Sequence, residues 1–169
     1  ELTGLRPDDH LLEVGCATGI ASIQLAERGY RLTCIELGAE LAKVAAQNLA
    51  AYSQVKVVHS AFESYRPNKY KTFALVFAAT AWHWIDPELR YKRAYELISP
   101  GGCLAFWSAF HVLPDDADPF FREIQTVYDE IGKGLDPNIE LPRPGDLPVL
   151  TEEIEASGLF NEIQVRHFD

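Results

Sequence analysis

A glycine-containing stretch near the N-terminus carries the residue types and spacing best suited to chemistry. Residues 11–19 run from an apolar segment that contains Glu13 into a turn with Gly15 and Gly19, and residues 20–28 have helix-forming composition. This order predicts a strand, a tight turn and a helix. Small residues in such a turn let a ligand lie against bare backbone, and the helix N-terminus offers unpaired N–H groups and a partial positive charge. The alternative is an ordinary strand-to-helix turn that binds nothing.

The elements that must position this turn repeat the order strand, then helix. The patterns predict strands at 10–14, 30–36, 54–59, 73–79 and 103–108, and helices at 18–28, 39–51 and 87–98. On the second helix we expect a buried face, formed by Leu41, Val44, Ala45 and Leu49. This order is typical of a doubly wound α/β domain with mostly parallel strands, for which we predict the strand order 3-2-1-4-5. The glycine turn then lies at the carboxyl edge of the sheet, where open α/β folds bind their ligands.

The chain changes character after residue 108. We expect a loop at 113–119, a helix at 120–131, irregular structure in the proline-rich 136–148, a helix at 151–156 and a strand at 160–168 beyond the fifth. The helix at 120–131 could wall an apolar pocket or cover the sheet edge, with one face formed by Phe121, Ile124, Val127, Tyr128 and Ile131. We therefore expect one domain over 1–169, with 113–150 as an insertion on the substrate side.

Composition limits the classes of partner. The 169 residues suit one domain with a real core, and 25 acidic against 15 basic residues give a net charge of −10, which disfavours a nucleic-acid partner. No apolar run could span a bilayer and no signal peptide is visible, so we expect a cytoplasmic protein with no membrane partner. The three cysteines lack metal-ligand spacing, so we expect reduced thiols and no metal. Because the chain begins at Glu1 and lacks methionine, we expect both ends to be incomplete.

Taken together, these residues resemble the class I S-adenosylmethionine-dependent methyltransferases of small-molecule type. The turn at 13–19 is similar to that family's first motif, acid-x-Gly-x-Gly-x-Gly, with Ala17 in place of the middle glycine. Residues 81–87 are similar to the corresponding stretch of the trans-aconitate type, and 99–102 resembles the Pro-Gly-Gly before the family's fifth strand. The departures are Ala74, where the family often has an acid, and the lack of the family's N-terminal lid and seventh strand.

This resemblance implies a Rossmann-like fold, S-adenosylmethionine as cofactor, and methyl transfer to a small-molecule acceptor, for which we expect a carboxylate or a hydroxyl. It implies that the cofactor is held by the glycine turn and by the ends of the second, third and fourth strands. The implied cofactor-binding residues are Glu13, Gly15, Cys16, Ala17, Thr18, Gly19, Glu36, Leu37, Ala61, Phe62, Glu63, Ala78, Ala79 and Trp82.

Two carboxylates have positions that favour binding of this cofactor. Glu36 ends the second expected strand, where a carboxylate can accept two hydrogen bonds from a ribose diol, and an exposed surface acid is the alternative. Glu13 lies inside the first expected strand, where a buried carboxylate suits a cationic ligand and would repel a pyrophosphate. The alternative for Glu13 is a structural acid bonded to N–H groups of the loop. We expect Glu13 and Glu36 to face one shared cavity.

Aromatic residues and histidines follow the fourth expected strand. Aromatic faces attract a sulfonium as they attract other cations, although Trp82 and Trp84 could equally pack in the core. We assign Trp84 and His111 to the substrate side. His83 is the candidate general base, with His111 as a second, but positioning of the nucleophile can replace a base.

Two other functions stay open at this point. An NAD-dependent oxidoreductase would use the same turn and Glu36, although the spacing of Gly15, Ala17 and Gly19 differs from G-x-G-x-x-G. A catalytically silent cofactor-binding domain is the second, because the chain lacks the family's lid and last strand.

Overall fold

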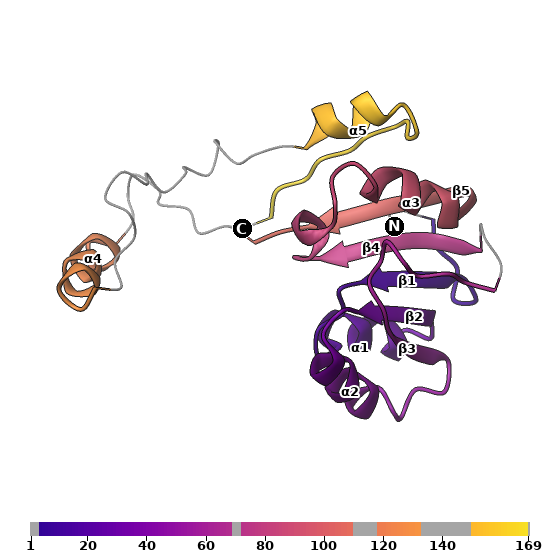
Figure 1. The fold of residues 1–169 in the computed structure, drawn as a ribbon, viewed down its shortest axis with the longest axis horizontal. Coiled ribbons are helices and arrows are strands. Elements are labelled where there is room, and N and C mark those ends of the chain that lie inside the picture. The colour runs from indigo at the N-terminus through magenta and orange to yellow at the C-terminus, as the bar shows by residue number, and fades with distance from the viewer. Residues whose placement is uncertain (1–3, 69–71, 110–117, 133–149, 169) are drawn as a thin grey trace. The chain divides into compact units, whose positions relative to one another are not determined.

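The computed structural model describes residues 4–68, 72–109, 118–132 and 150–168 (Figure 1). The expected loop at 113–119 lies mostly outside these residues, and the proline-rich 136–148 and His111 lie entirely outside them. The chain divides into two compact units, one formed by 1–108 with 151–169 and the other by 109–150. The site described below lies wholly in the first unit.

A five-stranded parallel sheet forms the centre of the first unit (Figure 1). Its order is β3-β2-β1-β4-β5, which confirms the predicted α/β class and strand order. The two central strands are almost wholly buried, as expected for apolar strands covered on both faces. The strands are β1 (His10–Val14), β2 (Arg31–Glu36), β3 (Val55–His59), β4 (Phe73–Ala79) and β5 (Ile98–Trp107).

Helices cover this sheet. On one face, a buried cluster joins strand residues such as Leu11, Cys34 and Phe77 to helix α1 (Ile20–Glu27) and to residues of and just after helix α2 (Ala39–Asn48). Helix α3 (Arg90–Leu97) packs against β4, β5 and helix α5 (Thr151–Ser157). A single 3-10 turn, η1 (Trp82–Trp84), follows β4, and helix α4 (Phe120–Glu130) belongs to the second unit.

The buried face of α2 differs from the expected one. Leu41 and Val44 are 43% and 39% exposed, whereas Ala42, Ala45 and Leu49 are buried. Helical periodicity allows either stripe, and the small side chains of the two alanines let the helix lie close to the sheet. The prediction was therefore right for Ala45 and Leu49 and wrong for the two larger residues.

Strand β5 begins at Ile98, five residues before the predicted start. Helix α3 ends at Leu97, and Ile98 is already extended, with φ −72° and ψ 132°. Between the pairs Phe73↔Ile98 and Leu75↔Cys103 the register shifts, so residues 99–102 form a bulge within the strand. A Cβ on Gly102 would lie 2.7 Å from the carbonyl oxygen of Ala74, so only glycine fits there. The segment Ser99–Gly102 therefore continues the strand instead of preceding it.

The predicted strand at 160–168 is not formed. The described residues 160–168 pair with no strand, and Glu162 has a left-handed φ of 56° that interrupts an extended chain. Alternating polarity alone cannot make a strand, because a strand also needs a neighbour with free backbone groups. Within the described part of the chain, no helix is both long enough and apolar enough to cross a bilayer.

Candidate functional site

The turn between β1 and α1 is built on left-handed backbone. Gly15, Ala17 and Gly19 have φ of 71°, 48° and 88°. Gly15 is required twice over, because a Cβ there would also lie 2.5 Å from the Cβ of Ala81 after β4. Ala17 adopts the left-handed region although it is not glycine, at a cost of about 1 kcal/mol. The left-handed backbone makes this turn tight, and the side chain of Ala81 packs directly against Gly15.

Glu36 holds this turn and the start of the next helix together. Its Oε2 accepts the backbone N–H of Ala17 at 2.8 Å, and its Oε1 accepts the backbone N–H of Gly38, also at 2.8 Å. A carboxylate has about four lone-pair positions, so each oxygen keeps capacity for one more donor. The side chain is only 8% exposed, so its orientation is set before any ligand arrives.

A cavity of about 320 Å³ lies at the carboxyl ends of β1, β2 and β4. Seven of the predicted site residues border it, namely Gly15, Ala17, Glu36, Leu37, Glu63, Ala79 and Trp84. The sequence analysis did not select six others, Val14, Ile35, Ser60, Thr80, Ala81 and Ile85. Only their position in the chain could have identified these six residues. Five lie at or just after the carboxyl end of a strand, and Ile85 lies directly after η1. A volume of this size falls at the lower end of small-molecule sites, about 300–1,000 Å³.

Glu63 borders the cavity and lies on the segment that follows β3. Its Oε1 accepts the backbone N–H of Asp86 at 3.3 Å, which ties this segment to the one after η1. Phe62 beside it is buried and packs against Trp82 with ring centroids 6.3 Å apart. Phe62 and Glu63 are both among the implied cofactor-binding residues, but only Glu63 borders the cavity.

Glu13 does not border the cavity, and the expectation that it shares one with Glu36 is wrong. Side chains alternate along a strand, so Val14 lines the cavity while Glu13 points to the opposite face, toward α1. Its Oε2 accepts the hydroxyl of Ser22, which in turn accepts the Cys34 thiol at 3.4 Å. Burial raises the pKa of Glu13 to about 7, partly opposed by the hydrogen bond from Ser22. Glu13 is thus a buried structural acid, bonded to a helix hydroxyl rather than to loop N–H groups.

The aromatic residues after β4 separate into two kinds. Trp82 is 1% exposed and stacks on Phe106, with ring centroids 5.0 Å apart and planes at 7°, so it packs in the core. Trp84 is 82% exposed and borders the cavity. His83 lies against Trp84, with centroids 4.9 Å apart, but it is not among the described residues that line the cavity. Of these three, only Trp84 lines the cavity.

The remaining predicted residues that the structure describes do not border the cavity. Cys16 and Ala78 are buried in the core, and hydrogen bonding to Cys34 and burial together raise the pKa of the Cys16 thiol. The Thr18 carbonyl accepts a hydrogen bond from Asn48 at 2.9 Å, and Gly19 lies against Leu49. Ala61 is partly exposed but does not border the cavity. In the described ranges, no cluster of three His, Cys, Asp or Glu residues could hold a metal ion.

Comparison with known proteins identifies the relatives of this fold. A family model described as a methyltransferase domain matches residues 12–106. The chain is 27% identical over 106 residues, 61% of its length, to a malonyl-[acyl-carrier protein] O-methyltransferase of Ilyobacter polytropus, of which it covers 39%. It is 26% identical over 135 residues, 79% of its length, to an uncharacterized methyltransferase of Mycobacterium bovis, of which it covers 52%.

A solved structure shows the same fold. The chain superposes on a SAM-dependent methyltransferase from Aquifex aeolicus with a TM-score of 0.59 and 19% identity, over 78% of this chain and 75% of that one. The chain spans about half or less of the length of the two curated relatives described above.

Proposed function

The chain belongs to the S-adenosylmethionine-dependent methyltransferase family, and from that premise we propose that its cavity holds the cofactor and that the protein methylates a small molecule. The observation that carries the proposal is Glu36, a carboxylate held at the cavity wall by two backbone N–H groups with capacity left for two more donors. A ribose diol presents two such donors side by side. The residues at the cavity therefore fit this cofactor.

Each end of the cavity suits a different part of the cofactor. We assign the bare backbone of Gly15 and Ala17 to the methionine part and the carboxylate of Glu63 to the amino group of adenine. Trp84 borders the cavity with a largely exposed indole, and an aromatic face attracts a cation by about 0.5–1 kcal/mol at an exposed site. When bound, S-adenosylmethionine supplies an electrophilic methyl group on a sulfonium.

The work left to the protein is positioning. In-line displacement requires the acceptor atom to lie opposite the leaving sulfur, and correct orientation can lower the barrier by up to about 7–11 kcal/mol. Trp84 and Ile85 offer an apolar wall for the acceptor. His83 stays a candidate base, since it lies against Trp84, which borders the cavity. The acceptor atom we propose is an oxygen of a carboxylate or hydroxyl, which the O-methyltransferase name of one relative supports.

Titration calorimetry with S-adenosylhomocysteine tests the cofactor assignment. We expect binding to the wild type and a loss of about 10-fold or more in affinity for Glu36→Ala, because hydrogen bonds to a charged group contribute about 1.5–3 kcal/mol. Glu40→Ala is the matched control, since Glu40 is an exposed acid on the adjoining helix. Equal affinity of Glu36→Ala and wild type would overturn the assignment of Glu36.

Turnover tests the proposed acceptor class. We expect formation of S-adenosylhomocysteine with members of a panel of small carboxylates and hydroxy compounds. Cofactor binding without turnover of any acceptor would instead favour a catalytically silent domain.

A further inference from the structure

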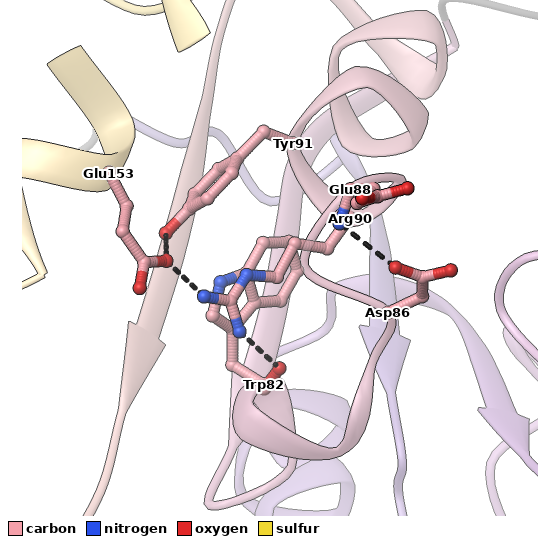
Figure 2. A network of polar contacts seen from close by, with 6 residues as sticks. All are labelled: Trp82, Asp86, Glu88, Arg90, Tyr91 and Glu153. Atoms are coloured by element: carbon pink, nitrogen blue, oxygen red, sulfur yellow. Dashed lines mark hydrogen bonds and ion pairs between the residues drawn. The ribbon is translucent and has the colours of Figure 1, made fainter. Parts of the chain in front are cut away.

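Arg90, the first residue of α3, is a buried cation without a role in the proposed site. Only 5% of its surface is exposed. Its Nη1 donates to the carbonyl oxygen of Trp82 at 3.3 Å, and its Nη2 forms an ion pair with Oε2 of Glu153 on α5 (Figure 2). The guanidinium carbon also lies 6.0 Å from the centre of the Trp82 ring and 5.2 Å from that of Tyr91. Arg90 therefore joins α3, α5 and the start of η1.

Glu153 is the counter-charge that makes this arrangement possible. A buried guanidinium is costly unless an anion and hydrogen-bond acceptors surround it. The carboxylate of Glu153 supplies the anion and one acceptor, and its Oε2 also accepts the Tyr91 hydroxyl at 3.2 Å (Figure 2). Glu153 itself is half exposed, with 47% of its side chain accessible. The contact thus depends on α5 remaining in place, and α5 directly follows the second unit in sequence.

The carbonyl that Arg90 holds belongs to the turn that leads to the cavity. Trp82 opens η1, and Trp84 and Ile85, two and three residues later, border the cavity. The N–H groups of both residues are bonded within the turn, to Ala81 and Trp82 respectively. Such a single turn moves as a unit, so a displaced Trp82 carbonyl would displace Trp84.

We propose that Arg90 is a positioning residue for the methyltransferase, which places Trp84 at the cavity through the Trp82 carbonyl and is itself held there by Glu153. The inference rests on the proposed function for the role of the cavity, but not for the link between Glu153 and Trp84. It adds a further consequence, that any ligand or partner that shifts α5 changes cofactor binding.

Fluorine NMR of the 5-fluorotryptophan-labelled protein tests the link without any cofactor. The three tryptophans give three resonances, assigned by Trp→Phe variants. We expect Glu153→Gln to shift or broaden the resonances of Trp82 and Trp84 and to leave that of Trp107 unchanged. Glu152→Gln is the matched control, because Glu152 is an exposed acid in the same first turn of α5. Unchanged Trp84 resonances in Glu153→Gln would overturn the proposal.

The affinity of the variants for S-adenosylhomocysteine shows whether Arg90 and Glu153 position Trp84 or only stabilise the fold. We expect about 3- to 10-fold weaker binding for Glu153→Gln, measured well below its melting temperature, and wild-type binding for Glu152→Gln. Arg90→Lys is the second variant, in case Glu153→Gln does not fold. A lysine can pair with Glu153 but has no planar fork to reach the Trp82 carbonyl as well, so we expect weakened binding there too.

A lowered melting temperature with unchanged affinity in both variants would make Arg90 and Glu153 structural only and overturn the proposal. If the cofactor assignment of the cavity is wrong, Glu36→Ala will bind S-adenosylhomocysteine as tightly as the wild type does. The fluorine spectra would still show whether Glu153 affects the position of Trp84.

Discussion

The backbone N–H of Ala17 donates to the carboxylate of Glu36 at 2.8 Å, across 19 positions of sequence. This hydrogen bond joins the turn after β1 to the end of β2, the adjacent strand. It presents a left-handed backbone and an acid side by side at one cavity.

Ala17→Gly is expected to stabilise the protein. Ala17 holds φ at 48°, which costs an L-residue about 1–2 kcal/mol, whereas glycine adopts it freely but loses more backbone entropy on folding. We expect a net gain of about 0.5–1 kcal/mol in the free energy of unfolding, measured by urea denaturation. Ala21→Gly, in the regular helix α1, should instead destabilise by about 1 kcal/mol. A loss of stability in Ala17→Gly would contradict the strained backbone.

Gly15→Ala is expected to abolish cofactor binding. The new Cβ would lie 2.5 Å from that of Ala81 and would also hold a φ of 71°. Because both residues border the cavity, relief of this overlap must deform its wall. Gly29→Ala is the control, since Gly29 has a φ of 88° but nothing within 4 Å of the added Cβ. We expect it to cost about 1 kcal/mol in stability and to bind S-adenosylhomocysteine as the wild type does.

Glu13 is expected to make stability depend on pH. Burial raises its pKa from 4.5 to about 7 in the folded protein, so the folded state binds this proton more tightly than the unfolded state does. Its contribution is therefore fully present below about pH 4.5 and is lost as pH rises to about 7, by on the order of 3 kcal/mol.

Glu13→Gln tests this dependence, because the amide keeps an acceptor for Ser22 but cannot ionise. We expect the variant to match the wild type in urea denaturation at about pH 4 and to exceed it in stability at about pH 8. Glu155→Gln, which changes an exposed acid on α5, should show no such difference. Equal stabilities of wild type and Glu13→Gln at both pH values would contradict the raised pKa.

The two tryptophans of η1 are expected to respond in opposite ways. Trp82 is 1% exposed, so Trp82→Ala should cost about 3–5 kcal/mol of stability. Trp84 is 82% exposed, so Trp84→Ala should change stability by less than about 0.5 kcal/mol. If Trp84 faces the sulfonium, its loss should weaken S-adenosylmethionine by about 2- to 5-fold and neutral S-adenosylhomocysteine less. Equal effects on both ligands, compared by calorimetry, would assign Trp84 to apolar packing alone.

The sequence by itself determined the elements whose signals are local. Apolar runs bounded by polar residues located β1 at His10–Val14 and β4 at Phe73–Ala79, with the bounds that the structure has. The alternation of strands and helices was enough to predict a doubly wound sheet of parallel strands, because parallel strands need crossover connections of one hand. The position of Glu36 at a strand end was likewise enough to predict that it lies at the same edge of the sheet as the glycine turn, since carboxyl ends of parallel strands share an edge. The hydrogen bond from Ala17 to Glu36 was not predicted.

Only the tertiary structure decided which way individual side chains point and which segments find partners. Glu13 is one residue from the cavity wall in sequence, but the alternation of β1 turns it toward Ser22 on α1. The segment 160–168 has the pattern of a strand but pairs with none, and Ser99–Gly102 has the composition of a turn but continues β5. Arg90 and Glu153, which form an ion pair, are 63 positions apart in sequence, and no periodic pattern of residues predicts that they meet. These outcomes depend on non-local neighbours, whose positions are set by the packed sheet and helices rather than by the residues beside them in sequence.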